Sequence, residues 1–185
     1  MGCGNFMHAG LPKRRQPFVF IPFSGSYKRI SMLTVLPSIT HSVYIHAPVQ
    51  RVFETLTTAQ GWNAWFTQNT TLQSHKGGSI VFRWENWGVA GETLQDSGMV
   101  QEIQPPNLFA FTWHPCGTET TVVFTLAAHE NTGTILRVTE TGHTHIQTLT
   151  DCACGWGEAL TLLKMYLEYG VTYKTVSSGN IAPQQ

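Results

Sequence analysis

The sequence predicts an α+β fold in which a curved antiparallel sheet wraps around one long C-terminal helix. Three features indicate this arrangement. Residues 155–170 carry a regular apolar stripe, and a series of short segments before them alternates apolar and polar residues. Two short segments with helical spacing follow the first alternating segment. A sheet with one apolar face must cover that face, and only the C-terminal segment predicts an element large enough to do so. The chain has 185 residues, 42% of them hydrophobic, which is enough for one domain with a substantial core.

The segment GWGEALTLLKMYLEYG, residues 155–170, predicts a long amphipathic helix. On a helical wheel with steps of about 100°, three leucines lie within about 40° of Trp156: Leu160, Leu163 and Leu167. Charged side chains take the opposite side, so we expect the apolar stripe to face the rest of the protein. Residues 148–151 fit the pattern of a helix start, and Gly170 predicts the helix end.

The remaining segments predict strands, with two short helices after the first strand. SITHSVYIHA, from residue 38, alternates apolar and polar side chains with the period of a strand. PVQRVFETLTT and AQGWNAWF follow with helical spacing, and Pro48 suits the opening position of the first helix. Between residues 79 and 142, four or five further alternating segments are separated by turn residues, which indicates an antiparallel sheet; the one before Pro105 reads SGMVQEI, starting at Ser97.

The charge balance argues against several classes of partner. Eleven Lys and Arg residues balance eleven Asp and Glu residues, so no electrostatic footprint indicates a nucleic acid or an anionic membrane. No apolar run approaches the roughly 20 residues of a membrane-spanning helix. Charged residues make up only 12% of the chain, while Trp and Phe are plentiful. This composition favours a large apolar interior, and the charge-poor surface favours self-association as a dimer.

The sequence predicts neither a metal nor a cofactor. Cys152 and Cys154 lie near His143 and His145, but their C-x-C and H-x-H spacings differ from those of structural zinc sites. The cysteines show no disulfide framework, which suits the cytosol of a bacterium. The sequence contains no phosphate-binding loop, dinucleotide fingerprint or nucleophile elbow.

Three parts are expected along the chain. Residues 1–31 have no sustained period and contain several Gly and Pro residues, so we expect a disordered segment or a translated leader, with Met32 as the true start. Residues 32–174 form the predicted domain. Residues 175–185 are expected to form a flexible C-terminal tail.

Five segments, taken in order, resemble one known family. They are YIHAPVQRVFETLTTAQGWNAWF, GGSIVFRWE, IQPPNLFAFTW, TTVVFTLAAHENTGTILRVTETGH and GWGEALTLLKMYLEYG. Over residues 38–170 the chain is similar to the activator-of-Hsp90-ATPase homologue group, which belongs to the START-like, helix-grip superfamily also called SRPBCC. The resemblance implies a Bet v 1-like curved sheet that grips the C-terminal helix around a hydrophobic cavity. It leaves the function open, because the superfamily includes lipid carriers, hormone receptors, cyclases and co-chaperone domains.

The implied cavity would be lined by inward-facing side chains of the sheet and the helices. Its expected wall consists of Trp65, Phe66, Phe82, Trp84, Val100, Phe109, Phe111, Trp113, Phe124, Leu136, Val138, Trp156, Leu160 and Leu163. The simpler interpretation is that these side chains only fill the core. The tryptophans favour a pocket, because an indole buries much area yet needs a partner for its N–H, which a cavity margin can supply.

The preferred hypothesis is non-catalytic binding of a small hydrophobic or amphipathic ligand in this cavity. One alternative is a chaperone- or stress-associated interaction module, with the exposed sheet face and the region of Trp62 and Trp65 as its contact surface. Another is a cyclase-like enzyme that uses His143 or Glu140 as a general acid or base, although two side chains three residues apart at a strand end are expected to point to different surroundings. The polar residues expected nearest the cavity rim are His143, Glu140, His114 and Arg83.

Overall fold

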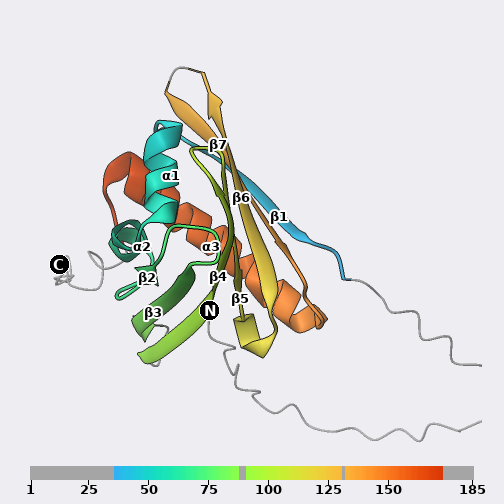
Figure 1. The fold of residues 1–185 in the computed structure, drawn as a ribbon. Coiled ribbons are helices and arrows are strands. Elements are labelled where there is room, and N and C mark those ends of the chain that lie inside the picture. Colours follow the sequence, from blue (N-terminus) through green and yellow to red (C-terminus); the bar gives the residue numbers. More distant parts are fainter. Residues whose placement is uncertain (1–35, 88–90, 131, 173–185) are drawn as a thin grey trace, which may run out of the picture. The chain divides into compact units, whose positions relative to one another are not determined.

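The computed structural model describes residues 36–87, 91–130 and 132–172. Within these residues the elements are β1 (Ile39–Ile45), α1 (Val49–Thr57), α2 (Ala59–Trp65), β2 (Thr71–Leu72), β3 (Ser79–Trp87), β4 (Glu92–Gln104), β5 (Leu108–Trp113), the 3₁₀ turn η1 (Pro115–Gly117), β6 (Thr120–His129), β7 (Gly133–Thr141) and α3 (Ile146–Tyr169). The strands form one antiparallel sheet in the order β1-β7-β6-β5-β4-β3-β2 (Figure 1). The leader and tail predicted at residues 1–31 and 175–185 lie outside the described residues.

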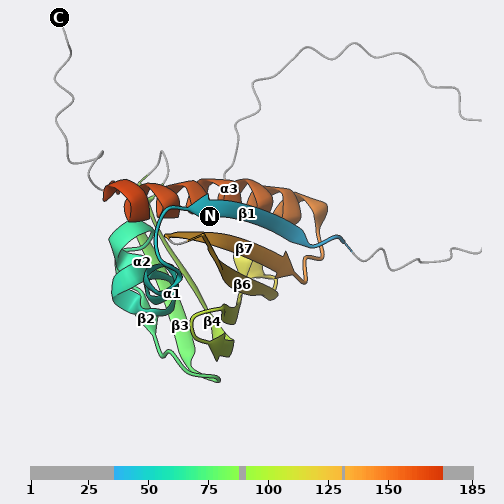
Figure 2. The ribbon, with the colours of Figure 1, turned by 90° about the horizontal axis from the view of Figure 1, so that it is seen from above.

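Helix α3 lies along the sheet next to β1, and α1 and α2 are grouped at one end of the sheet (Figure 2). This is the predicted helix-grip arrangement. The apolar stripe of α3 faces inward: Trp156, Leu160, Leu163 and Leu167 are all buried. The helix therefore covers the apolar face of the sheet, as the sequence predicts.

The C-terminal end of α3 agrees with the sequence prediction, whereas its start does not. The helix ends at Gly170, as predicted, because the backbone there is left-handed (φ 67°) and glycine adopts that conformation without steric cost. The start differs from the prediction: α3 begins at Ile146, and no side chain caps it. The hydroxyl of Thr150 donates instead to the Ile146 carbonyl oxygen inside the helix, at 2.8 Å.

Two strands differ from the sequence prediction. Strand β2 has only two residues, too few to show an alternating pattern. Strand β4 begins at Glu92, five positions before the predicted start at Ser97. Its first part is mostly polar and exposed, and its pairing with β3 rather than its hydrophobicity makes it a strand.

Aromatic rings fill the end of the core under α1 and α2. We call Trp62, Trp65, Phe66, Phe82, Trp84 and Phe111 the aromatic cluster. The ring centroid of Trp62 lies 4.8 Å from that of Phe82 and 5.1 Å from that of Trp65, and its Nε1 donates to the Leu56 carbonyl oxygen at 2.7 Å. Such contacts are typical of a close-packed aromatic core.

A charged clamp fixes the C-terminal part of α3 to the end of β1. Lys164 Nζ donates to the Tyr44 carbonyl oxygen at 2.6 Å and to Glu168 Oε1 at 2.7 Å. The same Glu168 oxygen accepts the backbone N–H of His46 at 2.7 Å. Hydrogen bonds to charged groups are the stronger kind, so the clamp holds α3 in a defined position over the sheet.

Candidate functional site

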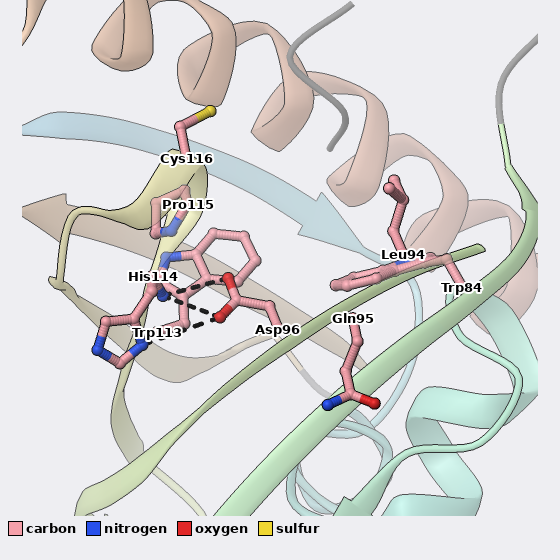
Figure 3. Close-up of a pocket in the computed structure, with 8 residues that line it drawn as sticks. All are labelled: Trp84, Leu94, Gln95, Asp96, Trp113, His114, Pro115 and Cys116. Carbon is pink, nitrogen blue, oxygen red and sulfur yellow. Dashed lines mark hydrogen bonds and ion pairs between the residues drawn. The ribbon is translucent and has the colours of Figure 1, made fainter. Parts of the chain in front are cut away.

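A pocket of about 100 Å³ lies where β3, β4 and β5 meet the η1 turn (Figure 3). It is lined by Trp84, Leu94, Gln95, Asp96, Trp113, His114, Pro115 and Cys116. Two of these residues, Trp84 and Trp113, belong to the wall predicted from the sequence. The pocket also includes His114, which the sequence analysis placed near the rim.

The alternation of β4 brings Leu94 and Asp96 into this pocket. Leu94 pairs with Trp84 across the β3–β4 ladder, so their side chains share one face of the sheet. Further along β4, Gly98 allows the strand to approach β5 closely. A Cβ atom at this position would lie 1.5 Å from the carbonyl oxygen of Thr112, which only glycine avoids.

The polar side of the pocket is built around Asp96. The backbone N–H of His114 donates to its two carboxylate oxygens at 3.0 and 3.1 Å, and the backbone N–H of Ser97 donates at 2.6 Å. Burial raises the pKa of Asp96, and these two donors partly offset that effect. The Nδ1 of His114 lies 2.8 Å from the Ser97 carbonyl oxygen, so this nitrogen carries a proton and donates. The pocket thus combines an apolar wall with one carboxylate and one imidazole.

Behind Trp113 lies a fully buried carboxylate, that of Glu140 on β7. Its Oε1 accepts the indole N–H of Trp113 at 2.8 Å and the hydroxyl of Thr120 at 2.6 Å. Its Oε2 accepts the indole N–H of Trp156 at 2.6 Å. We call Glu140, Trp113, Thr120 and Trp156 the carboxylate cluster. It gives two tryptophans the polar partner that buried indoles need, and it ties β5, β6, β7 and α3 together.

Glu140 and His143 meet, and here the sequence analysis was wrong. It expected the two side chains to point to different surroundings. Gly142 has a φ of 100°, a backbone conformation that favours glycine, and it turns the chain after β7. His143 therefore folds back, and its Nε2 lies 3.6 Å from Glu140 Oε1, with both side chains 0% exposed.

A thiol completes this buried group. Cys152, on the inner face of α3, offers its Sγ within 4.8 Å of the ligand atoms of Glu140 and His143. Burial, followed by the nearby charge of Glu140, raises the pKa of the Cys152 thiol to about 12. By itself this thiol is therefore protonated at neutral pH. Cys154, two positions on, is exposed and free.

The other residues of the predicted wall pack in the core and do not line the pocket described above. They are Trp65, Phe66, Phe82, Val100, Phe109, Phe111, Phe124, Leu136, Val138, Trp156, Leu160 and Leu163. Arg83 is exposed and donates to the Oε1 of Gln95, which lines the pocket, at 3.0 Å. Trp62 and Trp65 are each 1% exposed, so their indoles are not part of the exposed surface, and the hypothesis of an interaction module in this region stays a prediction.

Two functional candidates were missed by the sequence analysis, Leu94 and Asp96, and Cys152 was considered only together with Cys154 and the nearby histidines. The first two lie in the polar first part of β4, which was not predicted as strand. Extending the alternation of β4 backward from Val100 would have placed both on the inner face. Cys152 lies four positions before Trp156, so the same helical wheel places it on the buried stripe.

Comparison with known proteins identifies the family. The family described as "Activator of Hsp90 ATPase homolog 1-like protein" matches residues 46–168. The chain belongs to this family. The match runs from the end of β1 almost to the end of α3, and it confirms the resemblance seen in the sequence. None of the curated proteins compared matches the chain.

Solved structures share the fold. The Aha1 dimer from Colwellia psychrerythraea is 26% identical, with a TM-score of 0.61, over 73% of this chain and 98% of that one. CalU16 from Micromonospora echinospora is 24% identical, with a TM-score of 0.59, over 72% of this chain and 77% of that one. A protein from Staphylococcus saprophyticus is 23% identical, with a TM-score of 0.61, over 74% of this chain and 95% of that one. Within the described parts of the chain, no helix is both long and apolar enough to cross a membrane.

Proposed function

We propose that this protein binds a small hydrophobic or amphipathic molecule, with its apolar end in the pocket of Figure 3. The proposal rests on one observation: the pocket combines an apolar wall with polar side chains. Trp84, Leu94 and Trp113 form the wall, and Asp96 and His114 supply the polar groups. Small-molecule sites generally combine apolar walls with a few well-placed polar groups. The helix-grip fold supports the same role in general terms.

The size of the pocket limits the part of the ligand that enters it. Its volume is about 100 Å³, whereas pockets that enclose a drug-sized ligand measure about 300 Å³ or more. A single ring or the end of a short chain therefore matches it best. The side chain of His114 is 43% exposed at the rim, so the remainder of the ligand would extend past it toward solvent.

The polar side of the pocket favours a ligand that donates hydrogen bonds. The carboxylate of Asp96 is 15% exposed, and among the described residues it accepts backbone N–H groups and makes a weak contact with His114 at 3.9 Å. A cationic or N–H group of a ligand would stabilise the ionised carboxylate, whose pKa burial has raised. A single aromatic ring that carries an aminomethyl group is the simplest molecule with both properties.

The alternatives rank lower. A chaperone-associated role or a dimer draws support from the family's description and from the dimeric Colwellia relative, and both stay predictions. A cyclase-like reaction at Glu140 and His143 has weaker support, because both side chains are 0% exposed and Trp113 stands between Glu140 and the pocket. A bacterial cytosol stays the predicted setting.

The first test is native mass spectrometry of protein purified gently from its own cells. We expect one retained small molecule per chain, released on denaturation. The second arm measures the binding of benzylamine, which has one ring and one cationic amine, to three proteins: the unchanged chain, Leu94→Trp, which fills the pocket, and Thr93→Trp, which adds the same indole on the exposed face of β4.

Leu94→Trp should lower the affinity for the amine at least about tenfold, since a filled pocket removes the apolar contacts, while Thr93→Trp should leave it unchanged. Equal binding by all three proteins, together with an empty native protein, would contradict the proposal. Circular dichroism of each variant separates a blocked pocket from a lost fold.

A further inference from the structure

Three buried side chains from three different segments meet behind the pocket. Glu140 lies near the end of β7, His143 in the loop that follows it, and Cys152 in the first half of α3. One ligand atom from each lies within 4.8 Å of the other two, and all three residues are buried. Because each segment contributes one residue, no local spacing in the sequence reveals the group.

His143 has unmet hydrogen-bonding capacity. Its Nδ1 and Nε2 are both buried, and neither makes a hydrogen bond. Nε2 lies 3.6 Å from Glu140 Oε1, which is too far for a hydrogen bond. A buried polar group without a partner is destabilising, so an imidazole with two such atoms indicates that a binding partner belongs there.

Glu140 retains room for one more contact. A carboxylate offers about four acceptor positions, and Trp113, Thr120 and Trp156 use three of them. All three donors are neutral. Among the described residues, the carboxylate of Glu140 pairs with one basic side chain, that of His143. A buried carboxylate is costly unless a positive charge compensates it.

We propose that Glu140, His143 and Cys152 bind a divalent transition-metal ion of the zinc type. A thiolate, an imidazole nitrogen and a carboxylate oxygen are the three ligand types that Zn²⁺ accepts in proteins, and sites with three protein ligands leave a fourth position for water. A thiolate and a carboxylate together carry two negative charges, so an ion of charge +2 makes the buried group neutral. This inference revises the expectation of no metal and is independent of the ligand proposed above.

The geometry requires only a modest closure. Zinc lies about 2.0–2.3 Å from its ligands, so the ligand atoms of a tetrahedral site are separated by roughly 3.3–3.8 Å. The present spread of up to 4.8 Å must therefore shrink by about 1 Å. The side chains of His143 and Cys152 can supply this movement, whereas Glu140 is held by its three donors and serves as the fixed ligand.

Cobalt(II) provides a direct probe of the site, because a bound thiolate gives a charge-transfer absorption in the near ultraviolet. The full chain, freed of metal with a chelator, is titrated with CoCl₂. We compare the unchanged protein with Cys152→Ser, His143→Gln and the matched control Cys154→Ser, which removes the exposed thiol two positions away. Thermal unfolding with and without ZnCl₂ is the second readout.

We expect one equivalent of Co²⁺ to bind, with the thiolate absorption present in the unchanged protein and in Cys154→Ser and absent from Cys152→Ser. His143→Gln should weaken binding at least about tenfold. Zinc should raise the unfolding temperature of the two binding proteins only. The proposal is overturned if the unchanged protein takes up no Co²⁺, or if the absorption survives Cys152→Ser or disappears with Cys154→Ser. The unchanged protein and Cys154→Ser keep the test decisive even if Cys152→Ser does not fold.

Discussion

The end of the core under α1 and α2 is filled by aromatic rings, whereas the end under the first half of α3 contains a carboxylate, an imidazole and a thiol. In the aromatic cluster, the rings of Trp65 and Phe66 stack with centroids 4.9 Å apart. In the carboxylate cluster, the fixed point is Glu140, which accepts three hydrogen bonds. The pocket lies on the border, because Trp84 belongs to the first cluster and Trp113 to the second.

The difference separates two sources of stability. Buried rings stabilise the fold through the apolar area they remove from water and through close packing. A buried carboxylate must first lose its hydration, and its hydrogen bonds offset that loss only when the network is complete. His143, next to Glu140, leaves the network incomplete. The carboxylate cluster is therefore a poor means of stabilising the core and a good place to expect function.

The largest effect is expected in the aromatic cluster, from Trp62→Ala. Trp62 contacts five aromatic rings, including those of Phe82 and Phe111, so its removal leaves a large cavity. The free energy of unfolding, measured with urea, should fall by about 3–5 kcal/mol. Trp62→Phe, which keeps a ring but loses the bond to the Leu56 carbonyl oxygen, should cost less. A loss below about 1 kcal/mol for the alanine variant would mean that the rings are loosely packed.

In the carboxylate cluster, Glu140→Gln keeps the size of the side chain but replaces one acceptor oxygen by an N–H donor. That donor must face the indole N–H of either Trp113 or Trp156, so one hydrogen bond is lost and two buried donors oppose each other. The free energy of unfolding should fall by about 2–3 kcal/mol, with a change in tryptophan fluorescence.

The matched control for Glu140→Gln is Thr120→Val, which removes one of the three donors and leaves the carboxylate intact. It should cost about 1 kcal/mol. If Glu140→Gln were as stable as the unchanged protein, the two regions would not differ in their source of stability. The carboxylate cluster would then be stabilised by packing, as the aromatic cluster is.

The sequence predicted the aromatic region better than the polar one, for a physical reason. Burial of apolar side chains follows the period of the helix or strand, so residues such as Phe82 and Leu163 could be placed on the inner face from their positions alone. The elements, their order and the fold were predicted in the same way. The pocket was predicted only in part, because Leu94 and Asp96 lie in a stretch that reads as polar and becomes strand through pairing with β3.

The meeting of Glu140, His143 and Cys152 could not be predicted from any period. It depends on the backbone turn at Gly142, with its φ of 100°, and on where α3 begins. Neither is encoded in the alternation of apolar and polar residues. A buried polar group is placed by tertiary contacts, and for that reason the sequence analysis saw these residues as candidates but not as one site.

The smallest effect is expected at the border of the two regions, from Asp96→Asn, and its size depends on pH. Because burial raises the pKa of Asp96, the folded protein holds this proton more tightly than the unfolded chain does. The unchanged protein therefore loses stability as the pH rises through the ordinary pKa of an aspartic acid and then through the raised one, and below both values the group contributes nothing. Asparagine cannot ionise, and its Oδ1 still accepts the backbone N–H groups of Ser97 and His114.

The stability of Asp96→Asn relative to the unchanged protein should therefore increase between about pH 3 and about pH 7, by up to about 1 kcal/mol. Urea unfolding at the two pH values measures this difference. Glu119→Gln is the control. Glu119 approaches the imidazole of His114, as Asp96 does, but its side chain is 65% exposed, so no comparable trend with pH is expected. A trend of the opposite sign would show that the backbone donors outweigh burial at Asp96.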